Sequence, residues 1–181
     1  MSKNFSIFSS PFAFIATLFG IGKLPIAPGT WGSIFGLLTY LYFTIYFSLS
    51  LLAVIVITLF ISLFSVWVCE KATFYLSREE KDQKSIVLDE FAGIWIACCP
   101  AATILMVQEV IIYSLIAFLF FRLFDIWKPY PINVIDKKLK NGFGIVFDDL
   151  LAGLYAATSS SLVFYLSVSY THLRAHETLT D

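Results

Sequence analysis

Five carboxylates stand beside the apolar stretches of this sequence, where helix ends are expected. They are Asp89, Glu90, Asp125, Asp148 and Asp149. Two adjacent acids precede one apolar run, and two more precede another. If folding brings all five acids to one face of a helical bundle, the carboxylates repel each other unless a cation lies among them. Oxygen ligands of this kind suit Mg²⁺, which proteins usually share between one or two carboxylates and a phosphate.

A segment rich in proline, glycine and hydroxyl groups, residues 25–33 (PIAPGTWGS), precedes the first long apolar run. Its prolines and glycines predict a non-helical stretch. The hydroxyl groups of Thr30 and Ser33, together with exposed backbone N–H groups, could cradle an anion there. The alternative is an ordinary helix start, with Thr30 as the N-cap and Trp31 as an anchor in the membrane interface.

The composition limits the class of protein that carries these residues. Of the 181 residues, 59% are hydrophobic and 14% are charged, and the mean hydropathy is +0.82. Soluble domains have roughly 25% charged residues, and disordered chains have many charges and few aromatic residues. Nucleic-acid binding would require a basic surplus, whereas 12 Lys and Arg residues stand against 13 acids. A polytopic membrane protein fits these values.

Three apolar runs predict the helices that must position the acids. Residues 24–69 carry no charge, which is enough for two spans of about 20 residues, and we expect the turn at Ser48-Leu49-Ser50. Residues 91–121 are too long for one simple crossing at about 1.5 Å per residue, so we expect a hairpin that turns near Gln108-Glu109 and bends at Pro100. A last span begins at Leu150. The predicted fold is an all-α, polytopic membrane helical bundle with five spans, or four if residues 91–121 cross once.

The charges between the apolar runs predict the orientation. Residues 70–90 and 122–149 hold 19 of the 25 charged residues, nine of them Lys or Arg. The positive-inside rule therefore places both polar segments, and the five acids with them, on the cytoplasmic side.

The C-terminal residues 168–181 resemble one reading frame of a common sequencing-adapter sequence. We therefore expect a non-native tail there and a single membrane-embedded domain over residues 1–167. Both histidines of the chain, His172 and His176, lie in this tail. The body of the domain then contains no histidine.

Four motifs resemble those of the phosphatidylglycerophosphatase A (PgpA) family in their order and spacing. They are APGTWGS at 27–33, IVLDEFAG at 86–93, FRLFDIWKPYPI at 121–132 and GFGIVFDDLLAG at 142–153. The resemblance extends from about residue 20 to residue 156. It implies a Mg²⁺-dependent phosphoric monoester hydrolase of the bacterial inner membrane. Such an enzyme converts the lipid phosphatidylglycerophosphate to phosphatidylglycerol and inorganic phosphate, and its expected partners are this substrate and the bilayer.

The resemblance also implies roles for individual residues. The expected metal ligands are Asp89, Glu90, Asp125, Asp148 and Asp149. The expected catalytic groups are Glu90, Asp125, Lys128, Asp148 and Asp149. The groups expected to bind the substrate are Thr30, Ser33, Arg122 and Lys128. In these roles Arg122 would hold the phosphate through two hydrogen bonds, and Lys128 would neutralise another oxygen or the leaving glycerol alkoxide.

Residues that are absent restrict the nucleophile. Without a histidine in the body, a phosphohistidine route is excluded, and no cysteine is followed by an arginine at the C-x₅-R spacing. Activated water is therefore the expected nucleophile, with an aspartyl-phosphate on Asp125 or Asp148 as the alternative. A non-enzymatic membrane scaffold, or an ion-binding or transport protein, is the other class considered. Such a protein would place its acids within the spans, whereas here all the candidate acids stand at span ends.

Overall fold

The structure is a computed structural model that describes residues 10–74, 85–139 and 141–177, with side chains up to residue 167. Within these ranges every regular element is a helix, so the all-α prediction is confirmed for the described part. The elements are α1 (Pro11–Ala16), η2 (Ile21–Lys23), α2 (Pro28–Tyr46), α3 (Leu51–Thr73), α4 (Leu88–Cys98), η3 (Cys99–Thr103), α5 (Val107–Trp127), α6 (Ile132–Lys138) and α7 (Gly142–Glu177).

Three of the described helices are long and apolar enough to cross a membrane. They are α3, α5 and the Gly142–Ser167 part of α7. The four- or five-span prediction needs, in addition, α2 with its 19 residues and the shorter α4 with the η3 turn that follows it.

The predicted turn between the first two long helices is confirmed. Helix α2 ends at Tyr46 and α3 begins at Leu51. Ser50 is the N-cap of α3, and its side chain accepts a hydrogen bond from the Ala53 N–H at 3.3 Å. A serine that satisfies an otherwise unpaired N–H in this way fixes where a helix starts.

Two other predictions are confirmed only in part. The run 91–121 bends at Pro100 as predicted, because α4 ends at Cys98 and proline lacks the N–H that would continue it. The turn itself is formed by residues 104–106, just before Gln108-Glu109, which lie in the first turn of α5. The stretch 25–33 is not wholly non-helical: α2 begins at Pro28, where proline is tolerated in the first turn, and Ala27 rather than Thr30 is its N-cap.

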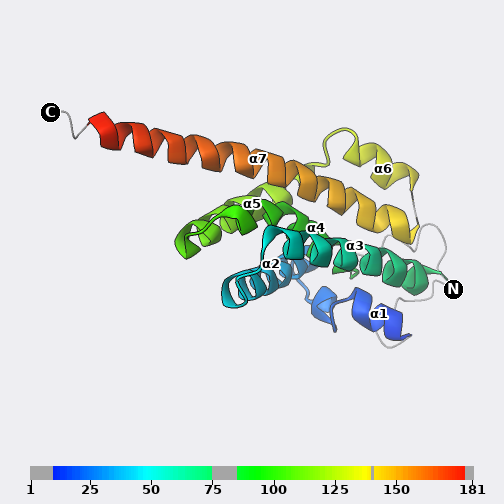
Figure 1. Cartoon of the computed structure of the whole chain (residues 1–181). Helices are drawn as coiled ribbons and strands as arrows, with labels where there is room; N and C mark the ends of the chain where they lie inside the picture. Colours follow the sequence, from blue (N-terminus) through cyan, green and yellow to red (C-terminus); the bar gives the residue numbers. More distant parts are fainter. Residues whose placement is uncertain (1–9, 75–84, 140, 178–181) are drawn as a thin grey trace.

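Helix α4 lies in the middle of the bundle and packs against α2, α3, α5 and α7 (Figure 1). Its crossing with α7 is the closest, because a Cβ atom on Gly93 would lie 2.8 Å from the Asp149 carbonyl oxygen, and one on Gly153 would overlap the Gly93 carbonyl oxygen. Small residues at a helix crossing allow two backbones to approach, as is common in membrane bundles. Trp95 of α4 is buried in the same core.

Polar groups in the bundle interior form hydrogen bonds between helices. Tyr113 of α5 is almost fully buried, and its hydroxyl lies 3.1 Å from the Ala157 carbonyl oxygen and 2.9 Å from the Ser161 hydroxyl of α7. Trp95 donates from Nε1 to the Thr39 hydroxyl of α2 at 3.2 Å. These contacts fix α5 and α2 against the pair formed by α4 and α7.

The arrangement gathers the four motifs at one end of the bundle. The N-terminal ends of α2, α4 and α7 lie there with the C-terminal end of α5 (Figure 1). Helix α7 continues through residue 177, and residues 178–181 of the expected tail lie outside the described residues. The boundary at residue 167 and the origin of the tail stay predictions.

Candidate active site

Helix α4 carries the first two acids in its first turn. Asp89 Oδ1 accepts a hydrogen bond from the Glu90 backbone N–H at 3.1 Å. The unpaired N–H groups at a helix start carry partial positive charge, which favours acids there by about 0.3–1 kcal/mol. Asp89 is 8% exposed, so this local effect is small beside the cost of burying its charge.

Helix α7 carries the next two acids in its second turn. The start of α7 is fixed by Asn141, whose side chain accepts from the Gly144 N–H at 3.0 Å, and by Glu70 of α3, which accepts from the Gly142 N–H at 2.6 Å. Consecutive residues on a helix point about 100° apart. Asp148 and Asp149 therefore point to different partners, although both are 4% exposed.

Asp149 joins the acids of α4. One oxygen from each of Asp89, Glu90 and Asp149 lies within 4.8 Å of the other two. We call these residues the three-acid group. None of them forms an ion pair with a basic side chain in the described part of the chain, and Glu90 Oε2 is buried without a hydrogen-bond partner. Two buried carboxylates and a half-buried one that face each other without a cation are the arrangement that a divalent metal ion would stabilise.

Asp125 of α5 has a different partner, Arg122, one turn earlier on the same helix. Arg122 Nη1 donates to Asp125 Oδ2 at 2.7 Å and to the Ser33 hydroxyl of α2 at 3.3 Å. The Ser33 hydroxyl in turn donates to the Gly29 carbonyl at 2.9 Å. Arg122 Nε is buried without a partner, so the guanidinium has donor capacity left. Asp125 also lies near enough to interact electrostatically with Asp149.

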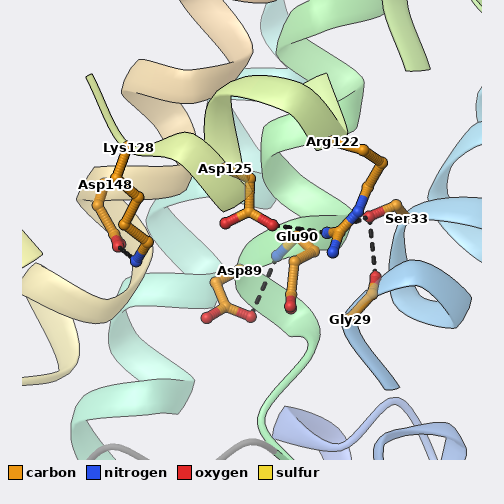
Figure 2. Close-up of polar contacts among 8 residues, drawn as sticks. All are labelled: Gly29, Ser33, Asp89, Glu90, Arg122, Asp125, Lys128 and Asp148. Carbon is orange, nitrogen blue, oxygen red and sulfur yellow. Dashed lines mark hydrogen bonds and ion pairs between the residues drawn. The ribbon is translucent and has the colours of Figure 1, made fainter. Parts of the chain in front are cut away.

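Asp148 pairs with Lys128, the residue that follows α5. Lys128 Nζ donates to Asp148 Oδ2 at 2.6 Å and lies 3.2 Å from Asp136 Oδ1 of α6. Burial works to lower the pKa of Lys128, but the attraction of Asp148, Asp149 and Asp136 outweighs burial and holds this pKa above its ordinary value. The ammonium group therefore stays charged. Figure 2 shows this pair on one side of Asp125 and the Arg122–Ser33 contact on the other.

Gly29 provides the space that Glu90 occupies. A Cβ atom at this position would overlap the Glu90 carboxylate and would lie 3.5 Å from Arg122 Nη1. The first turn of α2 therefore lies directly against both an acid of the three-acid group and the arginine.

The structure brings most of the predicted residues together, in two groups. Three acids converge as a possible metal site, while Asp125 and Asp148 each hold a basic side chain. Thr30 lies in the first turn of α2, three residues before Ser33 and so on a similar face of the helix. Sequence reasoning missed the contacts of Asp136, Glu70 and Gly29, because each depends on how another helix packs in three dimensions. Of these three residues, only Gly29 lies in one of the sequence motifs, the segment 25–33.

The arrangement suits a phosphate ester. Two basic side chains flank a group of acids that can hold a divalent cation, and the starts of three helices, which attract anions, lie at the same end of the bundle. Such a site can bind a phosphoryl group and neutralise the charge that develops during its transfer.

Comparison with known proteins gives consistent results. The family model described as Phosphatidylglycerophosphatase A matches residues 14–164. The chain is similar to a protein named phosphatidylglycerophosphatase A from Haemophilus influenzae, with 39% identity over 81% of this chain and 85% of the relative. A protein of the same name from Escherichia coli is 33% identical over 82% of this chain and 81% of the relative. A protein named putative phosphatidylinositol-3-phosphatase from Bacteroides thetaiotaomicron is 32% identical over 78% of this chain and 86% of the relative. No solved structure matches the chain.

Proposed function

This chain belongs to the phosphatidylglycerophosphatase A family, and on that basis we propose that it hydrolyses phosphatidylglycerophosphate to phosphatidylglycerol and inorganic phosphate. As a member of the family it is a phosphoric monoester hydrolase. The product is a glycerophospholipid, so the reaction would complete a step of phospholipid biosynthesis.

One observation carries the assignment of the cofactor. In the three-acid group Asp89 and Asp149 are buried and Glu90 is half-buried, and none of them has an ion pair among the described residues, although two basic side chains stand nearby. Both basic side chains are already engaged by other acids. A divalent cation would neutralise the three carboxylates together, and their hard oxygen atoms favour Mg²⁺.

The residues around the three-acid group divide the work of catalysis. A bound Mg²⁺ would supply charge neutralisation at the phosphate oxygens and a lower pKa for the attacking water. Arg122 would bind the phosphate through its remaining N–H groups, with Ser33 and Thr30 at the same side of the site. Asp125 holds Arg122 in place and faces Asp149, which makes it our choice for accepting the proton of the attacking water.

Lys128 acts on the leaving group in this scheme. Water attacks phosphorus, and the bond between phosphorus and the ester oxygen breaks. That oxygen stays on the terminal glycerol carbon as an alkoxide, whose charge the Lys128 ammonium neutralises as it forms. Asp148 keeps the ammonium in position. Attack by Asp125 or Asp148 itself, with an aspartyl-phosphate that water then hydrolyses, is the alternative route.

The lipid substrate sets the place of the site in the membrane. We propose that the protein is a multi-pass protein of the bacterial inner membrane in which α2 crosses with the three candidate spans, while α4 and η3 form the shorter arm of a hairpin. The basic residues of the segments 70–90 and 122–149 support a cytoplasmic site. There the phosphate monoester would meet the acids at the level of the lipid headgroups.

A phosphorylated inositol lipid is the second candidate substrate, because one relative carries the name phosphatidylinositol-3-phosphatase. Both lipids present a phosphate monoester, so a substrate panel separates them. The purified protein in mixed micelles with Mg²⁺ would receive either lipid, and released phosphate would be measured. We expect kcat/KM for phosphatidylglycerophosphate to be at least about tenfold higher than kcat/KM for the phosphorylated inositol lipid. The reverse preference would show that the inositol lipid is the substrate. No release of phosphate from either lipid would favour the scaffold or ion-transport class of protein.

A further inference from the structure

Lys128 is held in an unusual backbone conformation. It ends α5 with φ 46° and ψ 63°, in the left-handed region. A residue other than glycine adopts this conformation at a cost of about 1–2 kcal/mol. The Lys128 side chain leaves the chain where α5 ends, and its ion-pair partners lie on other helices.

Those partners come from two different helices. Lys128 Nζ lies 2.6 Å from Asp148 Oδ2 of α7 and 3.2 Å from Asp136 Oδ1 of α6. The Asp148 side chain is 6% exposed, whereas the Asp136 side chain is 34% exposed. The ammonium group thus stands between an inner carboxylate beside the catalytic acids and an outer carboxylate near solvent.

The outer carboxylate stands on a packed element rather than on a free loop. Helix α6 packs against α7, and Ile132, one helical turn before Asp136, is completely buried. The Ile132 N–H also donates to the Pro129 carbonyl at 2.8 Å, which ties the start of α6 to the chain that leaves α5. Asp136 is therefore placed firmly enough to direct a flexible lysine.

We propose that Asp136 is a positioning residue that holds the Lys128 ammonium at Asp148 and so aims its remaining donor at the substrate. A lysine has three N–H donors, and the two carboxylates engage two of them. Asp136 does not belong to the three-acid group, so it acts through Lys128. The alternative is an ordinary half-exposed ion pair, which contributes little to stability or activity.

Kinetics on five variants, one of them the double variant, test this role, and this part of the test rests on the proposed function. Asp136→Asn should lower kcat/KM for phosphatidylglycerophosphate about tenfold, mostly through kcat, because a misplaced group loses transition-state contacts. Asp136→Glu should restore most of the activity. Lys137→Gln removes an exposed charge from the same helix and should leave the kinetics unchanged. In a Lys128→Met background, Asp136→Asn should have no further effect. Full activity of Asp136→Asn, or an undiminished loss without Lys128, would overturn the proposal.

Chemical labelling tests the same contact without catalysis. The folded wild-type protein and Asp136→Asn would be treated briefly with an amine-acylating reagent, and each lysine would be quantified by mass spectrometry. We expect acylation of Lys128 to rise severalfold in the variant relative to Lys138. Equal labelling in both proteins would refute a positioning role. If the wild type released no phosphate from the lipid, the proposed function would fail, yet this labelling ratio would still decide the role of Asp136.

Discussion

Replacing Gly93 with alanine tests whether the close crossing of α4 and α7 sets the geometry of the three-acid group. The new Cβ atom would lie 2.5 Å from Cε2 of the buried Phe121 ring and 2.8 Å from the Asp149 carbonyl oxygen, and ordinary contact begins at 3.4 Å. The ring can shift, but the Asp149 oxygen is a backbone atom and cannot rotate away. The two helices must therefore separate by about 0.6 Å, from 2.8 Å to at least 3.4 Å.

This displacement is small for the fold and large for a metal site. Overpacking of this kind costs about 1–3 kcal/mol, which a packed bundle can survive. Metal–ligand distances, in contrast, tolerate only about 0.2 Å, and Mg²⁺ requires about 2.0–2.1 Å to each oxygen. Because Asp149 moves with its own carbonyl group, we expect the Mg²⁺ concentration for half-maximal activity to rise about tenfold or more in Gly93→Ala.

The assay is phosphate release from phosphatidylglycerophosphate across a Mg²⁺ titration, with the melting temperature measured in parallel. Gly36→Ala is the matched control, because its Cβ atom would overlap the Ile94 side chain and lie 3.2 Å from the Phe91 carbonyl oxygen where α2 crosses α4, and would not press on Asp149. The control should lose stability and keep its Mg²⁺ requirement. A folded Gly93→Ala protein with an unchanged Mg²⁺ requirement would refute the reasoning, as would an equal shift in the control.

Four further outcomes follow from the site. Asp149→Asn should lower Mg²⁺-dependent turnover by about 100-fold or more, measured at saturating lipid, because a ligand of the cation is lost. Arg122→Lys should raise KM about tenfold, since lysine cannot form the forked contact with phosphate. Because the pKa of Lys128 is raised, its attraction to Asp148 is present below the ordinary value of about 10.4 and is lost only as the pH rises through the higher folded value. Wild type and Lys128→Arg should therefore show the same alkaline profile up to about pH 10, and a decline confined to wild type would contradict this. Tyr113→Phe should lower the free energy of unfolding by about 1 kcal/mol, since its hydroxyl bonds between α5 and α7 are lost, with unchanged kinetics.

The sequence predicted the helical class and the principal acids, because both depend on local signals. A run of residues without charge predicts membrane helices, and the serines at 48 and 50 predict the turn between two of them. Paired acids before an apolar run predict a helix start. The bend at Pro100 was predicted correctly because proline cannot continue a helix normally. The turn was predicted a few residues too late, because the polar pair Gln108-Glu109 stands in the first turn of α5 and not before it.

The division of the five acids could not be read from the sequence. Asp148 and Asp149 are neighbours, and only the placement of α4 and α5 around α7 determines that one faces Lys128 and the other faces Asp89 and Glu90. The role of Asp136 was hidden for the same reason. Its partner Lys128 is eight residues earlier in the chain, and Lys128 has the left-handed conformation with which the chain leaves α5.

The central claim is that the three-acid group holds a divalent cation on which hydrolysis of the lipid phosphate depends. The most direct measurement is the initial rate of phosphate release from phosphatidylglycerophosphate by purified protein that has been stripped with EDTA, before and after Mg²⁺ is added back. The account predicts no release in the stripped protein and a saturable recovery with Mg²⁺. An equal rate in EDTA and in Mg²⁺ would contradict it.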